Sequence, residues 1–299
     1  MTPTDQRENA GAGAKVPLAS GRQNNLMLRV ASALVLAPAV LACVYIGGWI
    51  FSVLCALAAG GILWEWMRLV LARPDARALV PGFAALIPAL LCAGFNQPGA
   101  AIGVLATGAI LTWAVVTAWP RGFPEPNPAI WAAAGTIYSG VACLGPVLLR
   151  YDANLGFTAV LFLTITVWAT DIFAYGTGRA IGGALLWPQV SPNKTWAGAV
   201  GGLAGGVAAG TLVAYASGIG KLTTVGLIAL VLSVAAQAGD LLESAVKRRF
   251  GAKDTSGLIP GHGGLMDRLD GFLVAALAAL LIGMLRQGTS APAQGLLVW

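Results

Sequence analysis

Charged residues are scarce in this sequence. Asp, Glu, Lys and Arg make up 10% of its 299 residues, whereas about 25% is typical of soluble domains. Hydrophobic residues make up 57%, and no polar stretch is long enough for a separate soluble domain. The composition therefore excludes an ordinary soluble protein and predicts an all-α polytopic membrane protein. The one sizeable polar segment, residues 1–25, is predicted to be a disordered cytoplasmic tail.

Cysteine and histidine are scarce as well. The four cysteines all lie in apolar stretches, without the paired spacing of metal ligands or of a disulfide framework, so we interpret them as packing residues. The only histidine, His262, is flanked by glycines, which allow its backbone to approach a ligand closely. A lone histidine indicates a turn as readily as a general base.

About nine apolar segments are long enough to cross a bilayer, which takes roughly 17 to 25 helical residues. We place them near residues 26–46, 49–67, 79–96, 100–119, 129–149, 156–177, 196–217, 222–243 and 271–289. The first segment is not a signal peptide, because it is long and leads directly into the second. We divide the chain into N-terminal transmembrane helices, 26–150, and a C-terminal catalytic region, 151–299.

The distribution of Lys and Arg predicts the topology. With an odd number of spans and the N-terminus inside, fifteen of the eighteen Lys and Arg lie on one side, and only Arg150, Lys221 and Arg286 lie on the other. Because basic loops face the cytoplasm, the 178–195 and 244–270 loops are predicted to be cytoplasmic. The formal charge of +6 follows from this asymmetry, so no nucleic-acid partner is expected.

The charge that the sequence does contain is concentrated at residues 240–271. Asp240, Glu243, Ser244 and Lys247 are spaced to share one face of a helix. Asp267 and Asp270 follow on one face at the start of the last span, where carboxylates also suit the helix dipole. Between them the segment GLIPGHGG predicts a tight turn that folds the two acidic faces together.

This set of side chains is typical of a site for Mg²⁺ and polyphosphate. Mg²⁺ usually takes one or two carboxylates together with phosphate oxygens and water, and basic side chains neutralise the remaining phosphate charge. Taken alone, KRRFGAK at 247–253 would instead indicate a positive-inside anchor that contacts anionic lipid. The anchor interpretation does not account for the acids in the same loop.

Polar residues further upstream are candidates for the same site. Asp171 lies in an apolar segment, where an aspartate costs about 2.5 to 3.5 kcal/mol at mid-membrane; we favour a place in the polar site over a structural ion pair. Lys194 is expected at the start of a helix whose amides can hold an anion, with Ser191 as a helix cap or a substrate contact. Glu65 is expected to pair with Arg68 at a helix end.

Glycine is abundant, with 40 residues, and it clusters in GAVGGLAGGVAAG at 198–210. We interpret this segment as a helix-packing face, because it lacks the Gly-Lys-Ser/Thr ending of a nucleotide-binding phosphate loop. Such packing faces are also compatible with a homodimer.

The run SAVKRRFGAKDTSGLIPGHGGLMDRLD at 244–270 resembles the C-terminal motif of the phosphatidate cytidylyltransferases, or CDP-diacylglycerol synthases. The similarity extends upstream through Asp171 to Arg179 and through 191–196, and it is weak over the first 150 residues. Asn193 and Ala197 depart from the family, which has Lys and Glu there, and neither is counted as a site residue. The matching motif positions are Ser244, Lys247, Arg248, Lys253, Asp254, His262, Gly263, Gly264, Asp267, Arg268 and Asp270.

The resemblance implies an all-helical enzyme of the bacterial inner membrane that depends on Mg²⁺ and has its active site on the cytoplasmic side. Its partners would be CTP, phosphatidate and membrane lipid, and its products CDP-diacylglycerol and pyrophosphate. We assign Asp240 and Asp267 to metal binding, with Asp270 as a weaker ligand candidate and Asp171 either as a residue that supports the ligands or as a ligand of a second metal ion. The other expected catalytic residues are Lys247, Lys253 and Asp270, and the expected substrate contacts are Ser244, Arg248, Arg268, Lys194, Asp171, His262, Gly263 and Gly264.

Two other functions compete with this interpretation. The CDP-alcohol phosphatidyltransferases also use aspartates at a membrane surface, but their Asp-Gly-x-x-Ala-Arg motif is absent, because Asp270-Gly271 is followed by Phe-Leu-Val-Ala. A transporter could bind a coupling cation at Asp171 and Asp240. It should show internal repeats of broken helices, and none is visible in the sequence.

Overall fold

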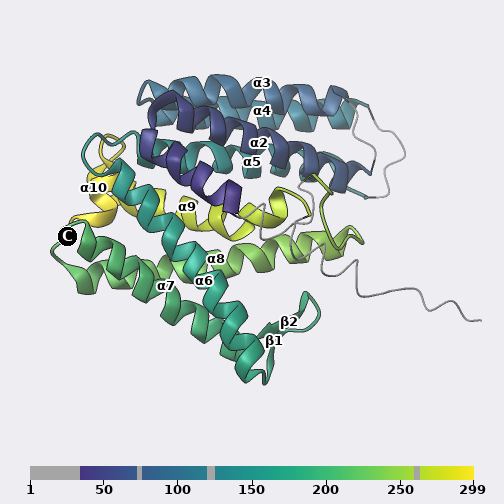
Figure 1. Ribbon diagram of the computed structural model, residues 1–299. Helices are drawn as coiled ribbons and strands as arrows, with labels where there is room; N and C mark the ends of the chain where they lie inside the picture. The colour runs from purple at the N-terminus through teal and green to yellow at the C-terminus, as the bar shows by residue number, and fades with distance from the viewer. Residues whose placement is uncertain (1–33, 73–75, 120–124, 259–262) are drawn as a thin grey trace, which may run out of the picture.

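The computed structural model describes residues 34–72, 76–119, 125–258 and 263–299. This part of the chain is almost entirely helical, which confirms the all-α polytopic fold (Figure 1). The tail of residues 1–25 and the beginning of the first predicted span lie outside the described residues. Eight of the described helices are long and apolar enough to span a membrane: α2 Gly48–Leu71, α3 Ala76–Gly94, α4 Pro98–Ala118, α5 Pro128–Arg150, α6 Gly156–Ile181, α7 Trp196–Ala216, α8 Leu222–Arg249 and α9 Met266–Gln287.

A shorter apolar helix, Leu34–Ile46, precedes α2. Gly47 and Gly48, the N-cap and first residue of α2, form the junction with φ angles of 69° and 53°, in the positive-φ region that glycine adopts at little cost. Arg150 at the end of α5 donates hydrogen bonds to the carbonyl oxygens of Val44 and Tyr45, at 2.8 and 3.0 Å. Carbonyls at a helix end have no partner within the helix, so Arg150 ties this helix to the bundle.

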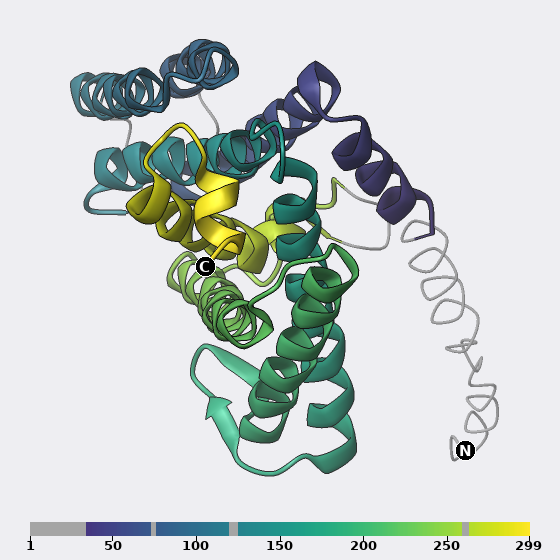
Figure 2. The same ribbon diagram turned by 90° about the vertical axis from the view of Figure 1, so that its left-hand side faces the viewer.

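Helix α9 occupies the centre of the molecule. Helices α2 to α5 pack together on one side of it, and α6 to α8 lie on the other, with α5 and α8 in direct contact with α9 (Figures 1 and 2). The short helix α10, Pro292–Leu297, folds back against α9 near the C-terminus. The last predicted span therefore contacts both groups of helices, and its first turn can join residues from both.

The glycine-rich segment forms the interior of α7, which confirms its interpretation as a packing face. A Cβ atom on Gly198 would lie 2.8 Å from the carbonyl oxygen of Ala174, and one on Gly202 would lie 2.9 Å from that of Thr170. Real Cβ atoms do not approach backbone so closely, so only glycine allows α6 and α7 this separation.

The connection between α6 and α7 differs from the prediction. Strands β1, Leu185–Trp187, and β2, Ser191–Thr195, form an antiparallel ribbon, and α7 begins only after it. Thr195 is the N-cap of α7, and its side-chain oxygen accepts a hydrogen bond from Gly198 N at 3.1 Å. Ser191 is therefore a strand residue and not the cap, and Lys194 precedes the helix instead of opening it.

Both loops that we expected on the cytoplasmic side lie at the same end of the bundle. Arg248 Nε donates a hydrogen bond to Val190 O in the β1–β2 turn at 3.4 Å, and Arg249 pairs with Glu125 between α4 and α5 at 2.8 Å. The opposite end carries the ends of α5 and α9 and the start of α8 (Figure 1). It therefore holds the three basic residues that the charge distribution separated from the rest, Arg150, Lys221 and Arg286.

Candidate active site

A largely buried lysine is shared by two carboxylates at the polar end. Lys247 Nζ lies 2.6 Å from Glu243 Oε2 and 2.7 Å from Asp267 Oδ1. The three side chains are only 11%, 1% and 8% exposed. The contact exists because α8 continues to Arg249, six residues beyond the predicted end of its span, which brings Lys247 to the first turn of α9.

A second lysine–carboxylate pair lies two helical turns away along α8. Lys194 on strand β2 forms an ion pair with Asp240. Ser244, one turn further along α8, donates a long hydrogen bond of 3.5 Å to Asp240 Oδ1. As predicted, Asp240, Ser244 and Lys247 line one side of the helix.

Helices α8 and α9 come closest beside Asp240. A Cβ on Gly239 would lie 2.6 Å from Asp270 O, and one on Gly271 would lie 2.8 Å from Ala236 O. The acid on α9 that lies beside Asp240 is therefore Asp270, whereas Asp267 lies beside Lys247. The structure brings the two acidic helix ends together, with a pairing of residues that the sequence did not predict.

Asp171 belongs to the same cluster. It extends from α6, and its charge interacts with those of Asp240, Lys194 and Arg268. The charge of Asp270 in turn interacts with those of Asp240 and Asp171. Helices α6, α8 and α9 thus each contribute one aspartate to a common region.

Asp267 also fixes the connector between α8 and α9. Its Oδ2 atom accepts hydrogen bonds from Gly264 N at 2.9 Å and from the backbone N and the hydroxyl of Thr255, both at 3.2 Å. Gly263 has a φ of 84° beside this carboxylate. Gly264 therefore contacts Asp267 through its backbone, and Gly263 supplies a turn conformation with little room for a side chain beside the carboxylate. His262 lies outside the described residues.

Glu65 is a site component that the sequence prediction misplaced. Its expected pairing with Arg68 is wrong, because Glu65 is completely buried and accepts hydrogen bonds from the start of α9, including Met266 N at 2.7 Å. Arg68 instead lies over the ring of Trp64, 4.6 Å from its centroid. The signal in the sequence was the position of a glutamate inside an apolar span, where burial without a partner is costly.

Other predicted contacts lie at the edge of this cluster. Arg248 donates hydrogen bonds to Val190 O and to Ala252 O, at 3.4 and 3.2 Å. Lys253 and Asp254 are exposed on the connector. The structure therefore assembles the site around the ends of α6, α8 and α9, with these loop residues outside its buried part.

The donor set fits a divalent cation that arrives with phosphate. In the described part of the chain, five carboxylates lie among three basic side chains, so acidic groups outnumber basic ones here. Among the described residues, no three acidic, histidine or cysteine side chains meet in a geometry that could hold a metal. Mg²⁺ commonly takes one or two carboxylates and completes its shell with phosphate and water. The carboxylates are Asp171, Asp240, Glu243, Asp267 and Asp270, and the basic residues are Lys194, Lys247 and Arg268.

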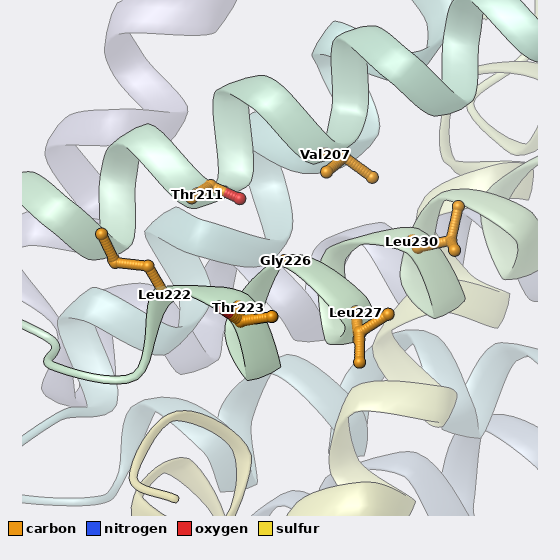
Figure 3. A pocket seen from close by; sticks show the side chains of 7 residues that line it. All are labelled: Val207, Thr211, Leu222, Thr223, Gly226, Leu227 and Leu230. Atoms are coloured by element: carbon orange, nitrogen blue, oxygen red, sulfur yellow. The ribbon is translucent and has the colours of Figure 1, made fainter.

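A cavity of about 450 Å³ lies elsewhere, between α7 and α8 (Figure 3). It contains no charged residue, and its lining comes from the second half of α7 and the first half of α8, away from the polar end. A charged nucleotide would find no partner there. The lining residues are Val207, Thr211, Leu222, Thr223, Gly226, Leu227 and Leu230.

Comparison with known proteins decides the family. The sequence model described as "Cytidylyltransferase family" matches residues 27–285. The chain belongs to this family. A phosphatidate cytidylyltransferase of Brucella abortus is 41% identical over 270 residues, which cover 87% of this chain and 94% of the relative. A phosphatidate cytidylyltransferase of Haemophilus influenzae is 36% identical over 283 residues, which cover 84% and 96%. These matches confirm the resemblance and extend it over the first 150 residues.

Proposed function

We propose that the protein transfers the cytidylyl group of CTP to phosphatidate, in phospholipid biosynthesis. A phosphate oxygen of phosphatidate attacks the α-phosphorus of CTP, the bond from that phosphorus to the leaving oxygen breaks, and CDP-diacylglycerol and pyrophosphate are formed. No general base is needed, because the attacking phosphate is already ionised. Since both reactants are anions, positioning and charge neutralisation supply most of the rate enhancement.

The observation that carries this proposal is the pair of lysine–carboxylate contacts at one end of the bundle, Lys194 with Asp240 and Lys247 with Asp267. Asp240 and Asp267 are our candidate Mg²⁺ ligands; because they lie beside different lysines, phosphate oxygens and water would have to complete the coordination, and the bound metal would neutralise triphosphate charge. Both carboxylates bond to lysines in the structure, so binding of metal and CTP requires Lys194 and Lys247 to turn from carboxylate to phosphate oxygens.

The remaining aspartates and the loop have proposed roles around this centre. Asp270, which lies beside Asp240, is our candidate for a further catalytic carboxylate. Asp171 is our candidate ligand for a second metal ion. Ser244 is close enough to Asp240 to contact the same phosphate. The further proposed substrate contacts are Arg248, Lys253, His262, Gly263, Gly264 and Arg268.

We propose that the site opens to the cytoplasm of a bacterial cell, with the protein in the inner membrane and its N-terminus inside. The concentration of Lys and Arg at the end of the bundle that carries the site supports this orientation. Phosphatidate would then enter from the adjoining leaflet while CTP arrives from water. A homodimer and the absence of a nucleic-acid partner stay predictions.

The decisive experiment incubates purified protein with radiolabelled CTP, phosphatidate and Mg²⁺, and measures labelled lipid. The Asp267→Asn variant should lose CTP-dependent product while still eluting as a folded protein in detergent. Glu125→Gln, which alters a carboxylate at the same end that pairs with Arg249, should retain activity. If the wild-type protein forms no labelled lipid, the proposed function is wrong. If Asp267→Asn turns over at a near-normal rate, Asp267 has no role in the mechanism.

A further inference from the structure

Glu65 is a buried carboxylate whose hydrogen-bond partners among the described residues are neutral groups of one connector. It lies on α2 and is 0% exposed. Its Oε1 accepts hydrogen bonds from Ser256 Oγ at 2.5 Å and Leu265 N at 2.8 Å, and its Oε2 accepts from Thr255 Oγ1 at 3.1 Å and Met266 N at 2.7 Å. A buried carboxylate is stable only when such donors replace the water it loses. The arrangement is therefore specific to a carboxylate at this position.

These donors come from both ends of the α8–α9 connector. Thr255 and Ser256 follow α8, whereas Leu265 and Met266 open α9, whose own N-cap residue supplies no side-chain hydrogen bond. The first amides of a helix lack partners within it, and an anion is favoured there. Glu65 thus supplies, from the N-terminal half of the chain, the cap that α9 does not provide for itself.

The same connector holds the proposed metal ligand. Asp267 directly follows Met266, and the Thr255 hydroxyl lies within hydrogen-bonding distance of both Glu65 and Asp267, at 3.1 and 3.2 Å. A Cβ on Gly264 would lie 2.8 Å from Glu65 Oε2. The Glu65 and Asp267 carboxylates are therefore held by one closely packed set of donors, and a displacement of the first shifts the second.

We infer that Glu65 is a positioning residue for cytidylyl transfer: from α2 it fixes the start of α9 and so orients the Asp267 carboxylate toward Lys247 and the substrates. This inference rests on the proposed function. Glu65 itself contacts no substrate. Its effect should be seen in how the protein uses Mg²⁺ and CTP, beyond any effect on folding.

Glu65→Gln tests this with almost no change in shape. Each carboxylate oxygen accepts from one hydroxyl and one backbone N–H, and a hydroxyl can rotate whereas a backbone N–H cannot. In either orientation the glutamine NH₂ group faces a backbone N–H of Leu265 or Met266, which loses its acceptor. Loss of a partner that orients a metal ligand typically costs 10- to 100-fold. We expect kcat/KM for Mg²⁺–CTP to fall by about that factor.

A positioning role also predicts that the Mg²⁺ concentration for half-maximal activity rises, with the KM for phosphatidate unchanged. Glu65→Asp, which keeps the charge, should restore part of the loss. Glu125→Gln is the matched control, since it makes the same chemical change at the same end of the bundle and should match the wild type. Folding is checked by size-exclusion chromatography and thermal melting in detergent.

The inference is overturned if Glu65→Gln keeps wild-type kcat/KM and Mg²⁺ dependence. It is equally overturned if activity falls only in proportion to folded protein. Should Glu65→Gln fail to fold, Ser256→Ala removes one donor and leaves the carboxylate, and it must then raise the Mg²⁺ requirement for the inference to stand. A wild-type protein inactive with CTP and phosphatidate would instead refute the proposed function.

Discussion

Replacing Lys247 with methionine removes one charge from the best-buried ion pairs of the site. The apolar part of the side chain is largely kept, but Glu243, only 1% exposed, loses the ammonium that lies 2.6 Å away. Asp267 loses the same partner and retains its hydrogen bonds from Thr255 and Gly264. Removing one partner of a buried pair costs about 3 to 5 kcal/mol, because the remaining charge is left uncompensated. We expect Lys247→Met to lower the free energy of unfolding by about that amount, because Glu243 and Asp267 share the ammonium that is lost.

The double variant Lys247→Met with Glu243→Gln separates stability from activity. Neutralising Glu243 removes one of the two acids that shared the ammonium, so part of the lost stability should return, whereas cytidylyl transfer should stay strongly reduced because Lys247 can no longer contact the phosphates. Denaturant titration in detergent, followed by tryptophan fluorescence, measures the first quantity, and labelled CTP measures the second. A single variant that unfolds within about 0.5 kcal/mol of the wild type, the range of an ordinary surface substitution, would refute the reasoning. So would a double variant no more stable than the single one.

Three further predictions concern the remaining contacts. Lys194→Met should lower activity at least about tenfold but cost under about 1 kcal/mol of stability, because the side chains of Lys194 and Asp240 are 29% and 32% exposed; a large drop in melting temperature would contradict this. Gly271→Ala should lower both melting temperature and activity, because its Cβ would lie 2.8 Å from Ala236 O, whereas Gly103→Ala in α4 has open space and should not. Removing divalent ions with EDTA should abolish labelled-lipid formation, and added Mg²⁺ should restore it; activity that persists in EDTA would refute the metal requirement.

Much of the fold followed from composition and spacing. Apolar runs of spanning length identified the helices because a bilayer leaves a chain few other ways to satisfy its backbone. The basic residues grouped the loops that the structure describes correctly at the two ends of the bundle, and the glycines of α7 marked a close helix contact. The β1–β2 ribbon escaped prediction because its strands of three and five residues are too short to show a periodic pattern.

The sequence by itself determined the helical membrane architecture, the family and the inventory of acids and lysines in the α8–α9 region, because each depends on local pattern or on similarity. Only the tertiary structure decided which side chains contact each other in the site. In the folded protein Asp270 lies beside Asp240, and Lys247 contacts both Glu243 and Asp267. Glu65 on α2 contacts the first turn of α9. The physical reason is that a buried charge is satisfied by whichever donors packing brings to it, and nearly two hundred residues separate Glu65 from Leu265 along the chain.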